Sequence, residues 1–143
     1  MAVTVRGLSK TFQSSRGQMV RAVDDLALTV EDREFLVILG PSGSGKTTLL
    51  RCIAGLERAD AGAISIDGRM VYSSAEKVWI PPERRGISMV FQSYALWPHM
   101  TAFENVAYPL RACGIGGDDL RARVTKAPRS LGAGHWSGAI RPS

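Results

Sequence analysis

The stretch Gly40–Thr47, with the sequence GPSGSGKT, constrains the fold of this chain more than any other feature. It fits the pattern G-x-x-x-x-G-K-[ST] at every fixed position. That pattern requires a strand before it and a helix after it. Phe35–Leu39 is a continuous apolar run, typical of a strand buried on both faces. Residues 46–57 carry apolar side chains at helical spacing, so both flanking elements are predicted.

The residue types in this stretch are those that bind phosphate. Glycines let the backbone curl tightly, and successive N–H groups then form a concavity for an anion. The helix that follows directs the positive end of its dipole to the same place. The alternative is a flexible Gly/Ser loop without a ligand. We predict that ATP or a related nucleotide binds here with Mg²⁺, through Gly40, Pro41, Ser42, Gly43, Ser44, Gly45, Lys46 and Thr47.

Lys46 and Thr47 have the most specific expected roles. The Lys46 ammonium adds a full positive charge for the β- and γ-phosphates, which makes it a candidate catalytic residue. The Thr47 hydroxyl is a candidate ligand of Mg²⁺.

Strand signals and helix signals alternate along residues 1–112, which predicts an α/β fold. Residues 2–8 and 26–30 alternate apolar and polar side chains, so they predict an N-terminal antiparallel β-layer. Residues 63–67 and 69–72 meet at Asp67-Gly68, a hairpin signal. Residues 87–91 predict a second buried strand, which with Phe35–Leu39 would contribute to an incomplete parallel sheet with helices.

The C-terminal third has weaker signals. Thr101 and Glu104 have the spacing of a capping box, so a helix is expected over residues 101–110, interrupted or ended by Pro109. Leu120 and Val124 can share one face of a short helix. Residues 113–143 form a divergent tail rich in Gly, Ala and Arg, for which we expect little order.

Composition limits the classes of protein that fit. The chain has 143 residues, 45% hydrophobic and 22% charged, which suits one globular domain. The net charge is +5, but no basic run marks a patch for nucleic acid, so no direct nucleic-acid binding is expected. Cys52 and Cys113 lack the spacing of a metal site or a disulfide framework. The sequence has no secretory signal and no membrane-spanning run, so a cytoplasmic protein that reaches a membrane through a partner is expected.

Several stretches together resemble the nucleotide-binding subunit of an ABC transporter. LLRCIAGLERADAGAISIDG, at Leu49–Gly68, looks like the segment after the phosphate loop in that family, and VFQSYALWPHMTAFENVAYPLR, at Val90–Arg111, looks like its Q-loop region. The stretch PPERRGISMVFQ is most similar to importer ATPases for iron, polyamines or sugars. The resemblance covers residues 2–112 and implies a partial P-loop NTPase domain.

The resemblance implies three further site residues. Phe12 matches an aromatic residue that stacks on adenine, although a core aromatic at a strand end is an alternative. Thr48 matches a position that also approaches the phosphates. Gln92 matches the Q-loop glutamine, which meets Mg²⁺ or the attacking water and is therefore a candidate catalytic and metal-binding residue.

The resemblance also implies partners and a location. They are transmembrane permease subunits, docked near residues 92–101, and a second nucleotide-binding subunit, at the cytoplasmic face of the inner membrane. The sequence contains no LSGGQ signature and no apolar strand ending in Asp-Glu, so we expect nucleotide binding with little or no hydrolysis by this chain.

Two other interpretations remain open. One is a nucleotide-binding module without a transport role, such as a repair ATPase or a small kinase in which Arg84 and Arg85 would be lid arginines. The other is an inactive pseudogene product. We hypothesise that residues after about 125 are encoded out of frame, because the resemblance fades there. The hypothesis fails if neither other reading frame encodes LSGGQ and an Asp-Glu strand end.

Overall fold

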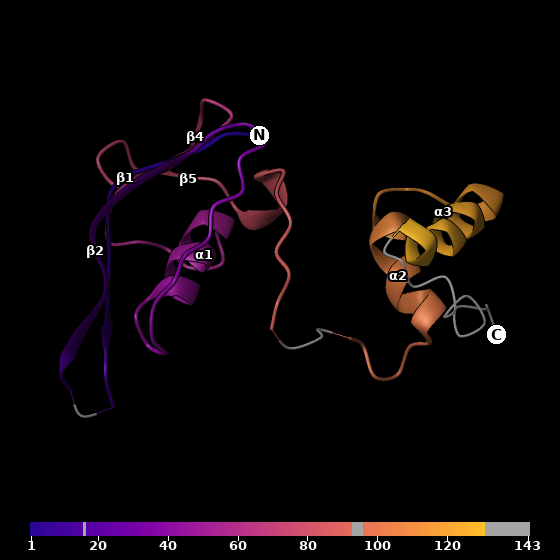
Figure 1. Cartoon of the computed structure of the whole chain (residues 1–143), viewed down its shortest axis with the longest axis horizontal. Helices are drawn as coiled ribbons and strands as arrows, with labels where there is room; N and C mark the ends of the chain where they lie inside the picture. The colour runs from indigo at the N-terminus through magenta and orange to yellow at the C-terminus, as the bar shows by residue number, and fades with distance from the viewer. Residues whose placement is uncertain (16, 93–95, 131–143) are drawn as a thin grey trace. The chain divides into compact units, whose positions relative to one another are not determined.

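The structure is a computed structural model that describes residues 1–15, 17–92 and 96–130. The chain divides into two compact units, Met1–Val90 and Phe91–Ser143, and each is described here by itself. Figure 1 shows the elements of both units along the chain. Within the described ranges, no helix combines the length and the apolar character needed to cross a membrane.

The first unit is built on one antiparallel sheet. Its strands are hydrogen-bonded in the order β2-β1-β3-β4-β5. The long pair β1 and β2 forms the N-terminal β-layer that the alternating pattern predicts, and all four strand pairings are antiparallel. The strands are β1 (Val3–Gln13), β2 (Met19–Val30), β3 (Ala61–Ile66), β4 (Arg69–Ser73) and β5 (Val78–Trp79).

The predicted hairpin at Asp67-Gly68 is confirmed. β3 and β4 pair as neighbours, with Ile66 opposite Arg69. Asp67 and Gly68 have φ values of 48° and 74°. Two positive φ values are typical of the type I′ turn, whose twist matches that of the flanking strands.

One helix, α1 (Lys46–Ala54), packs on this sheet. Leu49 and Cys52 on α1 are buried against Val5, Leu8 and Ile64 of the sheet, in the main core of the unit. The helix predicted from the apolar spacing after Gly45 is therefore confirmed, and it ends at Gly55 in a left-handed conformation. A short 3-10 turn, η1 (Pro82–Arg84), follows β5.

The predicted parallel sheet is not found in the described part of the chain. Phe35–Leu39 and residues 87–91 are not strands. Phe35 is 90% exposed and Val90 is 96% exposed, so the prediction of buried strands there is wrong. A parallel strand is stabilised by hydrogen bonds to a neighbour and by burial of both faces. No described segment provides that neighbour for either run.

Over the residues of the second unit that the structure describes, the chain forms two helices, α2 (Ala102–Ala112) and α3 (Gly117–Ser130). The predicted capping box is confirmed, because the Thr101 side chain accepts from the Glu104 amide and Glu104 accepts from the Thr101 amide. Leu120 and Val124 are buried together with Phe103 and Ala107, which confirms the shared helix face.

Two features of the second unit, the position of Pro109 and the extent of α3, differ from what the sequence predicts. Pro109 lies inside α2, so the prediction that it interrupts or ends the helix is wrong. Pro109 is exposed, so the carbonyl that it leaves without a helical partner can bind water. α3 occupies residues 117–130 of the segment for which the sequence suggests little order, and residues 131–143 lie outside the described residues.

Candidate functional site

The candidate site is the loop that leads into α1. Gly45 is the N-cap of the helix, with φ of 86°. A Cβ atom on Gly45 would lie 1.9 Å from the backbone oxygen of Ala22 on β2. A glycine is therefore required at this position for two reasons, the left-handed conformation and the close approach of β2. The contact fixes the beginning of α1 against the sheet.

The first turn of α1 has free amide groups. Among the described residues, no side chain caps the helix. The Leu49 amide donates to the Gly45 oxygen at 2.9 Å, but no acceptor in the described chain pairs with the amides of Lys46, Thr47 and Thr48. α2, by contrast, is capped by its own residues. The amides at the start of α1 are therefore available to an anion.

The charge at this end of α1 also suits an anionic ligand. The first turn contains no acidic residue. It begins with Lys46, whose positive charge is unfavourable beside the positive end of the helix dipole. The Lys46 ammonium donates to the oxygens of Gly40 and Pro41 at 2.7 Å and to Ser44 Oγ at 3.1 Å. These bonds hold the ammonium over the loop, and a bound polyphosphate would offset both positive charges.

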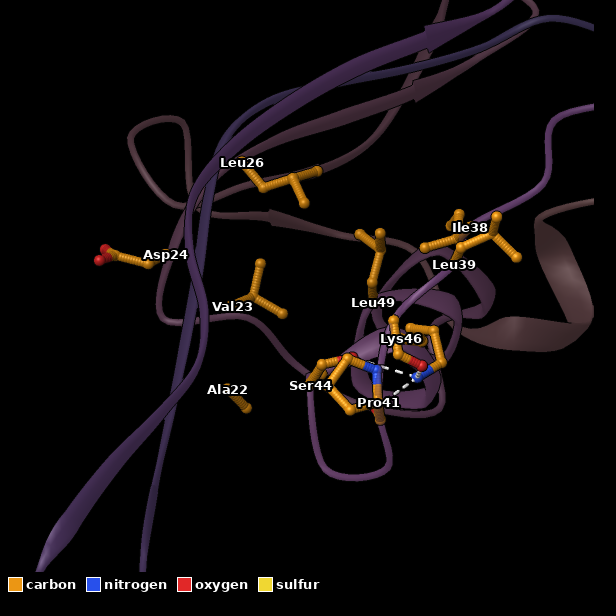
Figure 2. A pocket seen from close by; sticks show the side chains of 12 residues that line it. Ala22, Val23, Asp24, Leu26, Ile38, Leu39, Pro41, Ser44, Lys46 and Leu49 are labelled. Carbon is orange, nitrogen blue, oxygen red and sulfur yellow. Dashed lines mark hydrogen bonds between the residues drawn. The ribbon is translucent and has the colours of Figure 1, made fainter.

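A cavity of about 350 Å³ lies between the loop and β2. One wall consists of loop residues, including Pro41, Ser44 and Lys46. On this side the Lys46 ammonium donates to the backbone oxygen of Pro41 and to Ser44 Oγ. Figure 2 shows Val23 and Leu26 directed from β2 towards these residues. Ile38, Leu39 and Leu49 also line this cavity and complete its apolar wall. The cavity therefore has one polar and one apolar side.

An irregularity in β2 shapes the apolar wall. Leu8 pairs with Leu26 and Lys10 pairs with Val23, so β2 has one more residue than β1 over this stretch. Asp25 has φ of 44°, which marks the extra residue as a β-bulge. The bulge lets Val23 and Leu26 face the cavity together, while Asp24 points to the other side of the strand (Figure 2). No pattern in the sequence predicts this bulge.

The remaining residues of the predicted phosphate site lie in the same loop and helix turn. Ser42, Gly43 and Thr47 are exposed and Thr48 is half-buried. The loop is closed by a hydrogen bond from the Ser44 amide to the Pro41 oxygen at 3.3 Å. The structure therefore brings Gly40–Thr48 into one compact turn at the beginning of α1.

Phe12 lies on β1 and is 39% exposed. It pairs with Val20 of β2, two residues before Ala22, which lines the cavity. Two residues of a strand span about 7 Å. The Lys10 ammonium lies 5.0 Å from the centre of the Phe12 ring, a cation–π contact that the sequence did not predict.

Gln92 is exposed and lies in the second unit. Its role at Mg²⁺ or water therefore stays a prediction. In the described residues, no group of three or more His, Cys, Asp or Glu side chains could hold a metal ion. Within the loop and first helical turn, the Thr47 hydroxyl is exposed and fits the role of an oxygen ligand.

Arg85 is a residue whose position the sequence did not reveal. It is 5% exposed and donates to backbone oxygens at the end of α1. Its neighbour Arg84 is exposed. Nothing in the run PPERR distinguishes the two arginines, because their positions are decided by packing against α1.

Comparison with known proteins identifies the class to which this loop and fold belong. The family model described as ABC transporter matches residues 23–141, which is more than half of the chain. The chain belongs to the ABC transporter family. The match includes the loop, α1, β3, β4 and both helices of the second unit.

Individual relatives of this chain are import ATP-binding proteins. It is 46% identical over 113 residues to the trehalose/maltose import ATP-binding protein MalK of Thermococcus litoralis, covering 79% of this chain and 30% of the relative. It is 43% identical over 129 residues to the spermidine/putrescine import ATP-binding protein PotA of Haemophilus influenzae, covering 90% of this chain and 32% of the relative. The chain thus spans about a third of the length of the curated relatives it matches.

Solved structures show the same fold. A dimeric post-hydrolysis state of the ATP-binding cassette MJ0796, bound to ADP and Pi, matches with a TM-score of 0.74 and 30% identity, covering 89% of this chain and 56% of that chain. A second dimeric structure of MJ0796, described as a bacterial ABC transporter cassette, matches with a TM-score of 0.72 and 30% identity, covering 91% and 56%. The α/β prediction is confirmed at the level of the ABC cassette fold, with an antiparallel N-terminal sheet.

Proposed function

We propose that this chain is the N-terminal part of the ATP-binding subunit of an ABC importer, and that it binds the phosphates of ATP through Gly40–Thr48. The observation that carries the proposal is the first turn of α1. Three of its amides have no acceptor in the described chain, no side chain caps it, and a lysine stands where the helix dipole alone would disfavour one. An anion of high charge accounts for all three features.

The phosphate contacts follow from the loop geometry. The free amides of Lys46, Thr47 and Thr48 donate to phosphate oxygens at the positive end of α1. The Lys46 ammonium exchanges its bonds to the loop oxygens for bonds to the β- and γ-phosphates. The loop need not unfold for this exchange, because the Gly45 contact with β2 and the Ser44–Pro41 hydrogen bond do not involve the ammonium.

We propose that the Thr47 hydroxyl holds Mg²⁺, and the role of Gln92 at the metal or the attacking water is proposed from the family resemblance alone. Mg²⁺ is usually bound by one or two protein ligands and by phosphate oxygens and water, and when bound it neutralises charge on the phosphates. The single exposed hydroxyl at the start of α1 fits that pattern. We propose that Phe12 supplies a stacking surface for the adenine, which its partial exposure near the cavity strand allows.

The partners that we propose follow from the family. The relatives are named as import ATP-binding proteins, and the MJ0796 cassettes are described as dimeric. We propose that permease subunits dock near residues 92–101, at the cytoplasmic face of the inner membrane. A second nucleotide-binding subunit would complete the site. Because the sequence lacks LSGGQ and an Asp-Glu strand end, we expect little or no hydrolysis by the 143-residue chain.

A pair of lysine substitutions tests the proposal. Lys46→Ala removes the ammonium beside the free amides, whereas Lys126→Ala removes an exposed lysine from α3 with the same change in net charge. Charge-assisted hydrogen bonds contribute about 1.5–3 kcal/mol, so Lys46→Ala is expected to weaken ATP binding about 10- to 150-fold. Lys126→Ala is expected to bind like the wild type.

The measurement is isothermal titration of the full chain with ATP and Mg²⁺. Circular dichroism spectra of the three proteins establish that they are equally folded. Equal affinities of the wild type and Lys46→Ala, or no binding by the wild type, would refute the proposed phosphate site. ATP turnover by the wild type at the rate of full-length relatives would refute the expectation of weak hydrolysis.

A further inference from the structure

Arg85 is a buried charge that the phosphate site does not use directly. Arg85 is the residue directly after η1 and is 5% exposed. The guanidinium donates three hydrogen bonds to backbone oxygens. Nε donates to Ile80 at 2.7 Å, and Nη1 donates to Cys52 at 2.9 Å and to Ile53 at 2.8 Å.

Two of these acceptors lie in the last turn of α1. The final carbonyl groups of a helix have no partner within it, and they carry the negative end of the helix dipole. The Arg85 guanidinium therefore donates to the Ile53 oxygen and adds a second donor to the Cys52 oxygen, which also accepts from the Gly55 amide at 3.2 Å. It places a positive charge where the dipole favours one. The third bond, to Ile80, ties the same guanidinium to the segment after β5.

Among the described residues, the buried Arg85 guanidinium is compensated by backbone carbonyl groups and not by a carboxylate. Within the described chain Arg85 forms no salt bridge, and burial lowers the pKa of its guanidinium. Burial of a charge without a carboxylate is unfavourable, so the carbonyl groups of α1 provide the compensation. Gly55, at the end of α1, has φ of 80°, and a Cβ atom there would lie 2.5 Å from Arg85 Nε and 2.7 Å from Cζ. The guanidinium thus packs directly on the backbone of the helix cap.

The two ends of α1 are mechanically connected. The helix has nine residues, and at 1.5 Å per residue it is about 14 Å long. Its N-terminal end holds the free amides and Lys46, and its C-terminal end is held by Arg85. A helix this short behaves as a rigid rod, so the attachment of one end sets the tilt of the other.

We propose that Arg85 is a positioning residue for the phosphate loop: by holding the C-terminal end of α1, it sets where the amides of Lys46–Thr48 and the Lys46 ammonium lie. The role in ATP binding rests on the proposed function, whereas the hold on α1 does not. Arg85 touches no phosphate and acts through the helix.

Three variants of the full chain test this role. Arg85→Met removes all three bonds while keeping a long apolar side chain. Arg85→Lys keeps the charge but replaces the planar fork with one ammonium nitrogen, whereas the three present bonds leave from two nitrogens, Nε and Nη1. Arg84→Met is the matched control, because it makes the same substitution at the neighbouring exposed arginine.

Two measurements are made on each variant. Hydrogen exchange without nucleotide follows the amide of Leu49, which bonds to the Gly45 oxygen at the opposite end of α1 from Arg85. ATP affinity is measured by isothermal titration with Mg²⁺. A residue that matters only for overall stability would increase exchange in α1 and in the β1–β3 strands alike.

We expect Arg85→Met to increase exchange in α1, including at Leu49, while the β1–β3 amides keep their protection. ATP binding should weaken about 2- to 30-fold, the range typical of substitutions that couple to a distant site. Arg85→Lys should lie between Arg85→Met and the wild type in both measurements. Arg84→Met should match the wild type in both. If Arg85→Met does not fold, Arg85→Lys decides the outcome.

Two results would overturn the inference. One is unchanged exchange at α1 in the Arg85 variants, or an increase shared by the whole sheet. The other is wild-type ATP affinity in Arg85→Met when Lys46→Ala has lost binding. If the wild type itself binds no ATP, the proposed function fails and the role of Arg85 in nucleotide binding fails with it. Hydrogen exchange then still decides whether Arg85 holds α1.

Discussion

Replacement of Gly45 by alanine is the sharpest test of how β2 fixes the phosphate loop. A Cβ atom at this position would lie 1.9 Å from the Ala22 backbone oxygen, whereas real Cβ atoms essentially never approach another heavy atom within 3.0 Å. The positions of the Cβ atom and of the Ala22 oxygen are both set by the backbone, so rotation of a side chain cannot relieve this clash. The loop and β2 must therefore separate by about 1 Å.

The cost has two parts that a second variant separates. Alanine in the left-handed conformation costs about 1 kcal/mol relative to glycine. Gly43 has φ of 81°, close to the 86° of Gly45, but a Cβ atom there would meet no atom within 4 Å. Gly43→Ala is thus expected to lower the free energy of unfolding by about 1 kcal/mol. Gly45→Ala adds overpacking of about 1–3 kcal/mol, for a total of about 2–4 kcal/mol.

Urea unfolding followed by circular dichroism measures both free energies. Hydrogen exchange at the Leu49 amide reports whether the loss lies at the beginning of α1, where it bonds to Gly45. If Gly45→Ala and Gly43→Ala lower the free energy of unfolding by the same amount, the close approach of β2 contributes nothing and the reasoning is wrong.

Three further predictions concern other parts of the chain. Tyr72→Phe should lower the free energy of unfolding by about 1–2 kcal/mol, because the buried hydroxyl donates to a backbone oxygen at 2.7 Å, while Tyr108→Phe at a half-exposed tyrosine should change little; urea unfolding measures both. Burial raises the pKa of Cys52 to about 11, so at pH 8 a thiol reagent should modify the exposed Cys113 and reach Cys52 only after urea is added; equal labelling rates would contradict this. The capping-box amide and hydroxyl lower the pKa of Glu104 below its usual 4.5, so its support of α2 is complete above pH 4.5 and is lost as the pH falls through the folded-state pKa. On acidification, the wild type should lose more helical circular dichroism than Glu104→Gln.

Local features were predictable because their causes lie within a few residues. The capping box needs only Thr101 and Glu104 at the correct spacing. The hairpin at Asp67-Gly68 needs two residues that accept positive φ. The spacing of Leu120 and Val124 was sufficient to predict a shared helix face, since such pairs meet on any helix.

The predictions that failed depend on neighbours distant in the sequence. Phe35–Leu39 has the composition of a buried strand, but a strand forms only where another strand accepts its hydrogen bonds. Pro109 was expected to interrupt or end the helix, and it lies inside α2 instead. Its exposure, which lets water satisfy the carbonyl that loses its helical donor, depends on which face the second unit buries.

The sequence by itself determined the loop at Gly40–Thr47 and the charge of Lys46, because glycines, a lysine and a threonine at fixed spacing specify a backbone turn and a charge. It also determined the family, through several such stretches in order. Only the tertiary structure decided that β2 touches the backbone of Gly45 and that Arg85, rather than Arg84, holds the end of α1. Both depend on contacts between segments that are remote along the chain. In the second case, burial against α1 distinguishes two arginines that are alike in the sequence.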